Sequence, residues 1–246
     1  MFKIRGFNII AKAMILIACS LFAYSQPARN SVNTKACSQN DPNDLDRYAG
    51  RFAMDGGLVL VSRVVDGELT VRPIVWTSVQ TLRRTSGDSF GIEGRDDRKI
   101  AFGRDAGGCV DSVTINGFGS DGTFRKLGGE RVPIELLLSG EPERAAGLMI
   151  KTDTQSVAEA VSLARTVLEM VPSKVPFAIR FLNTISVQFP RDASVFSALG
   201  DGYISTGELD KARISFQRAR GLDPKDAAAI RGLRRLGLLS PTADEK

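Results

Sequence analysis

The hydrophobic pattern of the chain changes its period near Ser156, and this change divides the chain into two halves. Before it, short runs rich in Val, Ile, Leu, Thr and Phe alternate with Gly- and Asp-containing turn signals. After it, apolar residues recur three and four positions apart, which is the period of an amphipathic helix. The pattern predicts an α+β protein, with a small antiparallel β-barrel-like domain at residues 45–138 and an all-α domain at residues 156–240.

In the first half, the spacing of the turn residues is typical of a β-meander. Its turn signals are Asp55 to Gly57, Asp66-Gly67, Ser86 to Asp88, Asp105 to Gly108 and Asp121-Gly122. About seven strand-length runs at this spacing favour a closed or nearly closed antiparallel sheet, either a barrel or a sandwich. These runs are Tyr48–Met54, Leu58–Val65, Leu69–Ile74, Trp76–Leu82, Phe90–Glu93, Lys99–Arg104 and Cys109–Asn116.

The segment between the two halves has a weaker pattern. The apolar run Val132–Leu138 is interpreted as a closing strand. Ser139–Ala146 contains Gly140 and Pro142, and it is interpreted as a loop within a linker at residues 139–155.

Apolar residues in the second half trace one face of each of five predicted helices. Pro172 ends the first helix and Pro190 ends the second, because proline lacks the backbone N–H that a helix interior requires. The polar residues 241–246 form a tail. The predicted helices are residues 156–171, 174–189, 194–206, 209–221 and 227–238.

The first 25 residues have the composition of an export signal. Lys3, Arg5 and Lys12 form a basic region before the apolar run Ala13–Ala23, and small residues precede a cleavage point after Ser25. The expected mature protein is periplasmic or secreted, and it begins with a flexible linker at residues 26–44. Two alternatives are a lipoprotein signal that anchors the chain through Cys19 and an uncleaved anchor. The apolar run is shorter than the roughly 20 residues of a membrane span, so no integral span is expected in the mature chain.

Two cysteines, Cys37 and Cys109, follow the expected cleavage point. An even pair in an oxidising compartment favours a disulfide, which would stabilise the fold by roughly 4 kcal/mol in the chain-entropy model. A redox or metal pair is the alternative, and the absence of a C-x-x-C spacing and of histidine disfavours it.

Residues 193–226 resemble a tetratricopeptide repeat, which is a 34-residue helical hairpin with a fixed pattern of large and small residues. Phe196 stands where the family has Trp, and all the other signature residues fall at the expected offsets. The resemblance implies that the small residues allow close helix crossing while the aromatic ones fill the gaps. The packing residues are Phe196, Leu199, Gly200, Tyr203, Gly207, Ala212, Phe216, Ala219 and Pro224.

The preceding segment, residues 156–192, resembles the repeat less closely. Pro190, Ala178 and Leu182 correspond to Pro224, Ala212 and Phe216, but the Leu-Gly and Tyr hallmarks are absent from the first helix. We interpret residues 156–192 as a degenerate repeat and residues 227–238 as a capping helix.

Residues 45–127 are similar to a β-barrel-like accessory module of bacterial serine hydrolases of the β-lactamase and penicillin-binding type. The similarity covers Leu45–Phe52, Gly57–Leu60, Asp66–Val71 and the later Lys99–Phe102, Arg104–Gly108 and Val113. It implies a fold and an exported setting. It implies no catalytic role, because the nucleophile domain of those enzymes is missing.

The residue inventory disfavours catalysis. The chain contains no histidine, which removes the commonest general base and metal ligand. Gly119–Gly122 is not a G-x-S-x-G motif, and no serine has a lysine three residues later. Asp96 and Asp97 lie in a charge run with Arg95, Arg98 and Lys99, which favours a solvated turn over a cation site. We therefore expect a non-enzymatic protein without a catalytic residue, cofactor or metal.

The charge balance disfavours nucleic-acid binding. Without the leader the chain has 30 cations and 28 anions, so the formal net charge of +5 falls to +2. The C-terminal helices are nevertheless basic, and this pattern favours a solvated outer face over an anion-binding patch. These basic residues are Arg213, Arg218, Arg220, Lys225, Arg231, Arg234 and Arg235.

The expected function is protein–protein interaction in the bacterial envelope. In tetratricopeptide repeats the concave face is lined mainly from the first helix, so the resemblance implies a partner surface at Ser194, Ser197, Asp201, Ile204 and Ser205. The partner is a protein, and self-association is also compatible with so few repeats. One alternative is a small-molecule or lipid-binding barrel, which an apolar interior cavity would favour and a filled interior would contradict. Another is an accessory subunit of a serine-hydrolase system.

Overall fold

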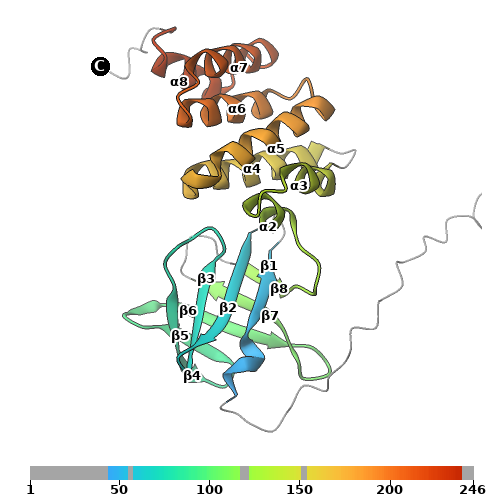
Figure 1. Ribbon diagram of the computed structural model, residues 1–246. Helices are drawn as coiled ribbons and strands as arrows, with labels where there is room; N and C mark the ends of the chain where they lie inside the picture. The colour runs from blue at the N-terminus through green and yellow to red at the C-terminus, as the bar shows by residue number, and fades with distance from the viewer. Residues whose placement is uncertain (1–43, 55–57, 117–121, 151–153, 240–246) are drawn as a thin grey trace, which may run out of the picture. The chain divides into compact units, whose positions relative to one another are not determined.

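A computed structural model describes residues 44–54, 58–116, 122–150 and 154–239 of the 246-residue chain. A short 3-10 helix, η1 (Leu45–Tyr48), leads into a sheet, and the rest of the described chain is helical (Figure 1). The predicted α+β class is confirmed. The expected leader, Cys19, Cys37 and the tail lie outside the described residues, so the cleavage site, the lipid anchor and the disulfide to Cys109 stay predictions.

Eight strands follow one another in a meander, and each is antiparallel to its neighbours. β8 pairs with β1 through Phe52 opposite Lys126 and Ala53 opposite Arg125, so the sheet closes into a barrel. The barrel expected from the turn spacing is confirmed. The strands are β1 (Gly50–Ala53), β2 (Val59–Val65), β3 (Glu68–Pro73), β4 (Gln80–Ser86), β5 (Ser89–Ile92), β6 (Arg95–Arg104), β7 (Val110–Asn116) and β8 (Gly122–Lys126).

Local hydrogen bonds explain where strand prediction failed. β4 begins at Gln80 and not at Trp76, because the Arg72 guanidinium donates to the carbonyls of Ile74 and Trp76, at 3.3 and 2.7 Å, and holds this segment as a loop. β8 was missed, since Phe124 is its only buried residue and no apolar run marks it. Of the predicted turns, Asp66-Gly67 is confirmed, with φ values of 52° and 79° that suit a two-residue hairpin.

The charge run that begins at Arg95 was wrongly assigned to a turn. The turn lies one residue earlier in the sequence, at Gly94, whose φ is 75°. Residues 95–104 form β6, which is antiparallel to both β5 and β7. The exposed Asp97 and Lys99 therefore belong to a paired strand.

One part of the barrel interior is filled by aromatic rings. Tyr48 packs against Phe90 and Phe102 at ring-centroid distances of 5.0 and 4.8 Å, and Phe52 lies 5.9 Å from Phe102. The Tyr48 hydroxyl donates to Asp88, which also accepts two hydrogen bonds from Arg104 at 2.7 Å. These hydrogen bonds, those from Arg104 above all, lower the pKa of Asp88 to about 2.

The expected closing strand at Val132–Leu138 is wrong, because this segment contains helix α2 (Pro133–Leu138). Pro133 occupies the first helical position, where its missing N–H is not needed, and the Glu135 carboxylate accepts the Val132 N–H at 3.1 Å. The expected linker likewise contains α3 (Pro142–Met149), which also begins with a proline.

The remaining helices agree with the predicted ranges within a few residues. Each packs against the next, and α4 also contacts α6 while α6 contacts α8. Their buried faces form one core that includes Val59, Val61 and Val75 of the barrel. The elements are α4 (Thr154–Met170), η2 (Pro172–Lys174), α5 (Val175–Gln188), α6 (Ala193–Ser205), α7 (Leu209–Leu222) and α8 (Ala227–Arg235).

Candidate protein-interaction surface

Phe216 lies at the centre of the last three helices. A Cβ atom on Gly200 of α6 would lie 2.5 Å from the Phe216 ring, and one on Gly232 of α8 would lie 2.3 Å from it. The ring is therefore enclosed between two backbones that approach closely because both residues lack a side chain. Ala212 and Ala219, one turn before and after Phe216 on α7, are fully buried.

The other residues of the predicted repeat pattern lie in α6 or in the turns before α7 and α8. Phe196 and Leu199 are buried, while Tyr203 is half-buried and its hydroxyl lies 3.4 Å from the Asn183 amide of α5. Gly207 has a φ of 77° in the turn between α6 and α7, and Pro224 lies in the turn before α8.

Helices α4 and α5 cover the segment that was interpreted as a degenerate repeat. Ala178 and Leu182 are fully buried. Gly202 of α6 approaches the hairpin closely, since a Cβ atom there would lie 2.9 Å from the Ile179 side chain.

The five residues expected to contact a partner differ in accessibility. Ser197 is fully buried, so its assignment to the partner surface is corrected, whereas Ser205 is exposed. Ser194 donates to Asp192, the N-cap of α6, and Ser205 donates to the Asp201 carbonyl. Ile204 is half-buried against the helical core.

An open hollow lies beside Ser194, and its wall is supplied mainly by α4. Sequence reasoning placed the partner surface on α6 alone and missed this contribution. A signal was present, because small and polar residues recur on α4 at intervals of three and four positions opposite its buried stripe. The hollow, here called the α4 groove, is lined by Ala158, Val161, Ser162, Arg165, Thr166, Glu169 and Ser194.

Asp201 connects the α4 groove to α6. Its carboxylate lies 3.3 Å from the Arg165 guanidinium, which forms an ion pair between the two helices. Burial raises the pKa of Asp201, and this effect exceeds the opposing effects of Arg165 and Arg231. The charges of Glu169 and Asp226 also act on Asp201, so these five groups, with Asp201 included, comprise three acidic and two basic ones.

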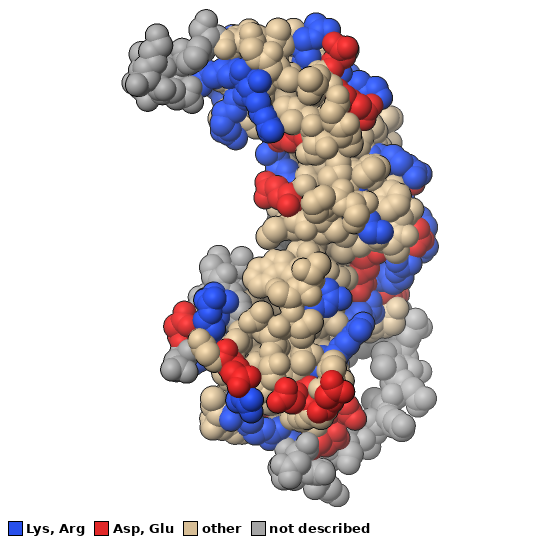
Figure 2. Space-filling model, turned by 60° about the vertical axis from the view of Figure 1, so that its left-hand side comes forward, with Lys and Arg blue, Asp and Glu red and all other residues tan. Residues whose placement is uncertain are grey.

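The basic residues of the last helices are mostly exposed. Figure 2 shows Lys and Arg side chains gathered over the C-terminal helices, with acidic side chains among them. Arg218 is stacked on Phe196, with its guanidinium carbon 4.0 Å from the ring centroid, and it donates to the Pro190 carbonyl at 3.2 Å. This contact assigns Arg218 a packing role, because the guanidinium covers an aromatic face.

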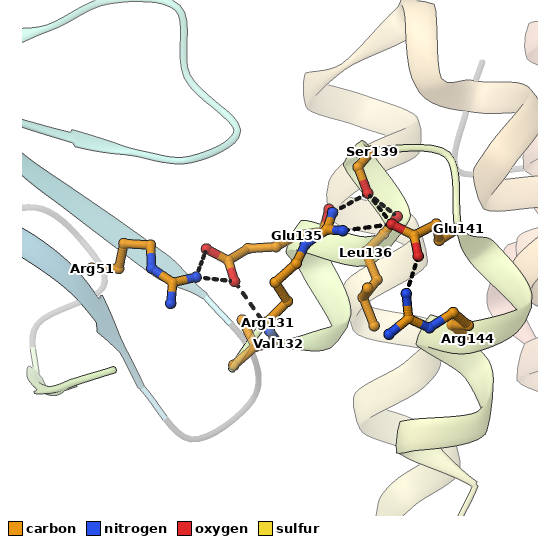
Figure 3. Close-up of polar contacts among 8 residues, drawn as sticks. All are labelled: Arg51, Arg131, Val132, Glu135, Leu136, Ser139, Glu141 and Arg144. Atoms are coloured by element: carbon orange, nitrogen blue, oxygen red, sulfur yellow. Dashed lines mark hydrogen bonds and ion pairs between the residues drawn. The ribbon is translucent and has the colours of Figure 1, made fainter. Parts of the chain in front are cut away.

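An ion pair connects helix α2 to strand β1 of the barrel (Figure 3). Arg51 of β1 donates from one nitrogen to both carboxylate oxygens of Glu135 on α2, at 2.6 Å each. Its other terminal nitrogen donates to the Gly128 and Glu130 carbonyls, at 2.5 and 3.2 Å. Glu135 is 10% exposed, so this pair is largely shielded from water.

A second cluster continues from α2 into α3. Glu141 accepts from Arg131 at 2.5 Å and also contacts Arg144, and Arg131 additionally contacts Ser139 (Figure 3). Hydrogen bonds from Arg131 and Arg144 lower the pKa of Glu141. The two clusters hold the short helices between the barrel and α4.

Comparison with known proteins leaves the chain without an assigned family. No protein-family model and no curated protein matches it. Within the described residues no group of three or more Cys, Asp or Glu side chains is arranged to hold a metal ion. None of the helices that the structure describes is both long and apolar enough to cross a bilayer.

Proposed function

We propose that this protein is an exported, non-enzymatic adaptor of the bacterial envelope that binds a protein partner through a tetratricopeptide-type helical surface. The observation that carries the proposal is the packing of the last five helices. Contacts between α4 and α6 and between α6 and α8 set alternate helices side by side, as in a stack of helical hairpins. The enclosure of Phe216 by Gly200 and Gly232 supports the repeat assignment.

The α4 groove supplies the recognition chemistry. Asp201 is partly dehydrated and pairs with Arg165, which lines the groove together with the exposed Glu169. A partner cation set against Asp201 and Glu169 would gain a favourable charge interaction in a partly shielded site. The preferred partner is therefore a protein segment that carries a Lys or Arg side chain.

Site-specific photocrosslinking in the native host tests the adaptor function. A benzoylphenylalanine residue replaces Ala158, an exposed residue that lines the groove, or, as the control, the exposed Ile214 on α7. The Ala158 position is expected to give a discrete crosslinked product that contains a second protein, and the Ile214 position is not. Crosslinking at neither position, or equally at both, would contradict the proposal.

A charge-swapped variant separates recognition from stability. Arg165→Glu combined with Asp201→Arg keeps an ion pair between α4 and α6 but reverses the charges that a partner meets. The double variant is expected to unfold at a similar urea concentration and to lose the Ala158 crosslink. Retention of the crosslink would exclude this ion pair from partner recognition.

A further inference from the structure

The barrel interior is only partly filled. Next to the aromatic cluster of Tyr48, Phe52, Phe90 and Phe102 lies a cavity of about 430 Å³. Its barrel wall is formed by inward-facing residues such as Leu60, Val71 and Phe124. The loop after β3 and helices α2 and α4 complete the enclosure. A volume of this size is typical of small-molecule sites in proteins.

The cavity lining is apolar in its depth and polar at its rim. Of its 16 lining residues, 13 are apolar, and among these 16 described residues none carries a charge. Leu60, Val71 and Leu163 are buried, whereas the polar residues Gln80, Thr166 and Ser162 are half-buried or exposed. Figure 2 shows a mostly uncharged surface where the barrel meets the helices, between charged regions to either side.

This gradient defines the chemistry of an occupant. A hydrocarbon chain in the cavity would displace water from the buried walls. Each buried methylene group would make the free energy of binding more favourable by about 0.8 kcal/mol. The hydroxyl and amide groups of Ser162, Thr166 and Gln80 offer hydrogen bonds to a polar end at the rim. A carboxylate or ammonium end would meet no counter-charge in the lining.

The volume limits the length of the occupant. At about 30 Å³ per small non-hydrogen atom, as for a water molecule in the liquid, 430 Å³ accommodates about 14 such atoms. We propose that the cavity at the barrel mouth binds one lipid-like chain of about this size, with its hydrocarbon part inside the barrel and an uncharged hydroxyl, ester or amide end at Gln80, Ser162 and Thr166.

Trp76 makes the proposal directly measurable, because it is the only tryptophan of the chain and it lines the cavity. The full chain is expressed, and the form that remains after any processing by the host is purified. This protein is then titrated with 11-bromo-1-undecanol. The bromine quenches indole fluorescence on contact. Saturable quenching is expected, and 11-bromoundecanoate, with the same chain and a charged end, is expected to bind at least about tenfold more weakly.

Variants at the rim test the location. Thr166→Phe on α4 and Gln80→Phe on β4 each place a ring in the opening from a different element, and each is expected to weaken alcohol binding at least about tenfold. Ala158→Phe is the matched control, because it adds the same ring to an exposed position of α4 that does not line the cavity. Circular dichroism verifies the fold of each variant.

Three results would overturn the proposal. The first is quenching that does not saturate, which would indicate non-specific partitioning. The second is equal affinity for the alcohol and the carboxylate, which would contradict an uncharged rim. The third is unchanged binding in both folded rim variants. The photocrosslinking result of the adaptor hypothesis is independent of all three.

Discussion

At the scale of single residues, the enclosure of Phe216 is the most sensitive point of the helical half. Gly200→Ala places a methyl group 2.5 Å from the Phe216 ring, and neighbouring helices must separate to admit it. We expect the free energy of unfolding to fall by about 1–3 kcal/mol, as measured by urea denaturation. Gly221→Ala on α7 is the control, because its Cβ would meet no atom within 4 Å. It is expected to be neutral or stabilising by up to about 1 kcal/mol.

A double variant tests whether the Phe216 ring is the cause of the loss of stability in Gly200→Ala. Gly200→Ala combined with Phe216→Leu removes the ring that the methyl group meets. The two substitutions are expected to couple, so that the double variant is more stable than the sum of the single effects allows. Strict additivity would show that Gly200 is small for another reason.

Asp88 makes the barrel sensitive to acid. Its folded pKa of about 2 lies below the value of about 3.9 for an unfolded Asp, so its ionised form stabilises the fold above pH 4. This stabilisation is lost as the pH falls from about 4 to about 2, because the proton binds the unfolded state more tightly. Asp88 is 30% exposed, so screening limits the contribution to about 1 kcal/mol.

The Asp88→Asn variant isolates this contribution, since it removes the charge and keeps an oxygen for Tyr48 and Arg104. Urea denaturation of both proteins at pH 6 and pH 2 provides the measurement. The stability difference between them is expected to be larger at pH 6. A difference that does not change with pH would contradict the assigned role of the ion pair with Arg104.

At the scale of elements, the Arg51–Glu135 pair controls the attachment of α2 to the barrel. Arg51→Met leaves the largely buried Glu135 carboxylate without its partner, and we expect a loss of about 3 kcal/mol in the free energy of unfolding. Arg83→Met serves as the control, because the Arg83–Glu93 pair is exposed, and its loss is expected to be below about 1 kcal/mol. Equal effects in the two variants would show that shielding from water does not strengthen the Arg51 pair.

The elements differ in how well the sequence predicts them. The barrel could be predicted because turn chemistry is local, as at Asp66-Gly67, and the long helices because their apolar period is regular. Helix α2 was missed since an apolar hexapeptide suits a strand as well as a helix, and its capping by Glu135 depends on one side-chain hydrogen bond. β8 was missed because pairing with β1 and β7, rather than its own hydrophobicity, makes it a strand.

The candidate sites were less predictable than the elements. The resemblance to a repeat indicated α6, but the burial of Ser197 and the contribution of α4 depend on how successive helices pack. The cavity could not be predicted, because a cavity is the space that side chains from several elements leave empty. Leu60, Phe124 and Leu163 meet there from positions far apart in the chain.

At the scale of the whole molecule, the core of the helical half extends into the barrel, whose interior holds a second buried cluster of its own. Val59, Val61 and Val75 of the barrel belong to the same buried cluster as the faces of the helices. We expect one cooperative unfolding transition, since the helical core is incomplete without these barrel residues. Trp76 fluorescence and far-UV circular dichroism, which report on the cavity lining and on the helices, should give coincident urea midpoints.

The Val61→Asp variant is expected to differ from the unaltered protein in the number of unfolding transitions. It places an unpaired carboxylate where the barrel contacts the helical core, so the two signals are expected to separate into two transitions at lower urea concentrations. Two transitions in the unaltered protein would instead show that the halves fold independently.

The pairing of β8 with β1 has a consequence for assembly. Unpaired N–H and C=O groups along a sheet edge are the usual template on which another chain adds a strand or begins to form fibrils. Because the described strands form a complete ring, this barrel offers no such template. If two copies associate through the described strands, the contact is therefore expected between side-chain surfaces, and the sheet should resist amyloid-like growth for as long as the ring stays closed.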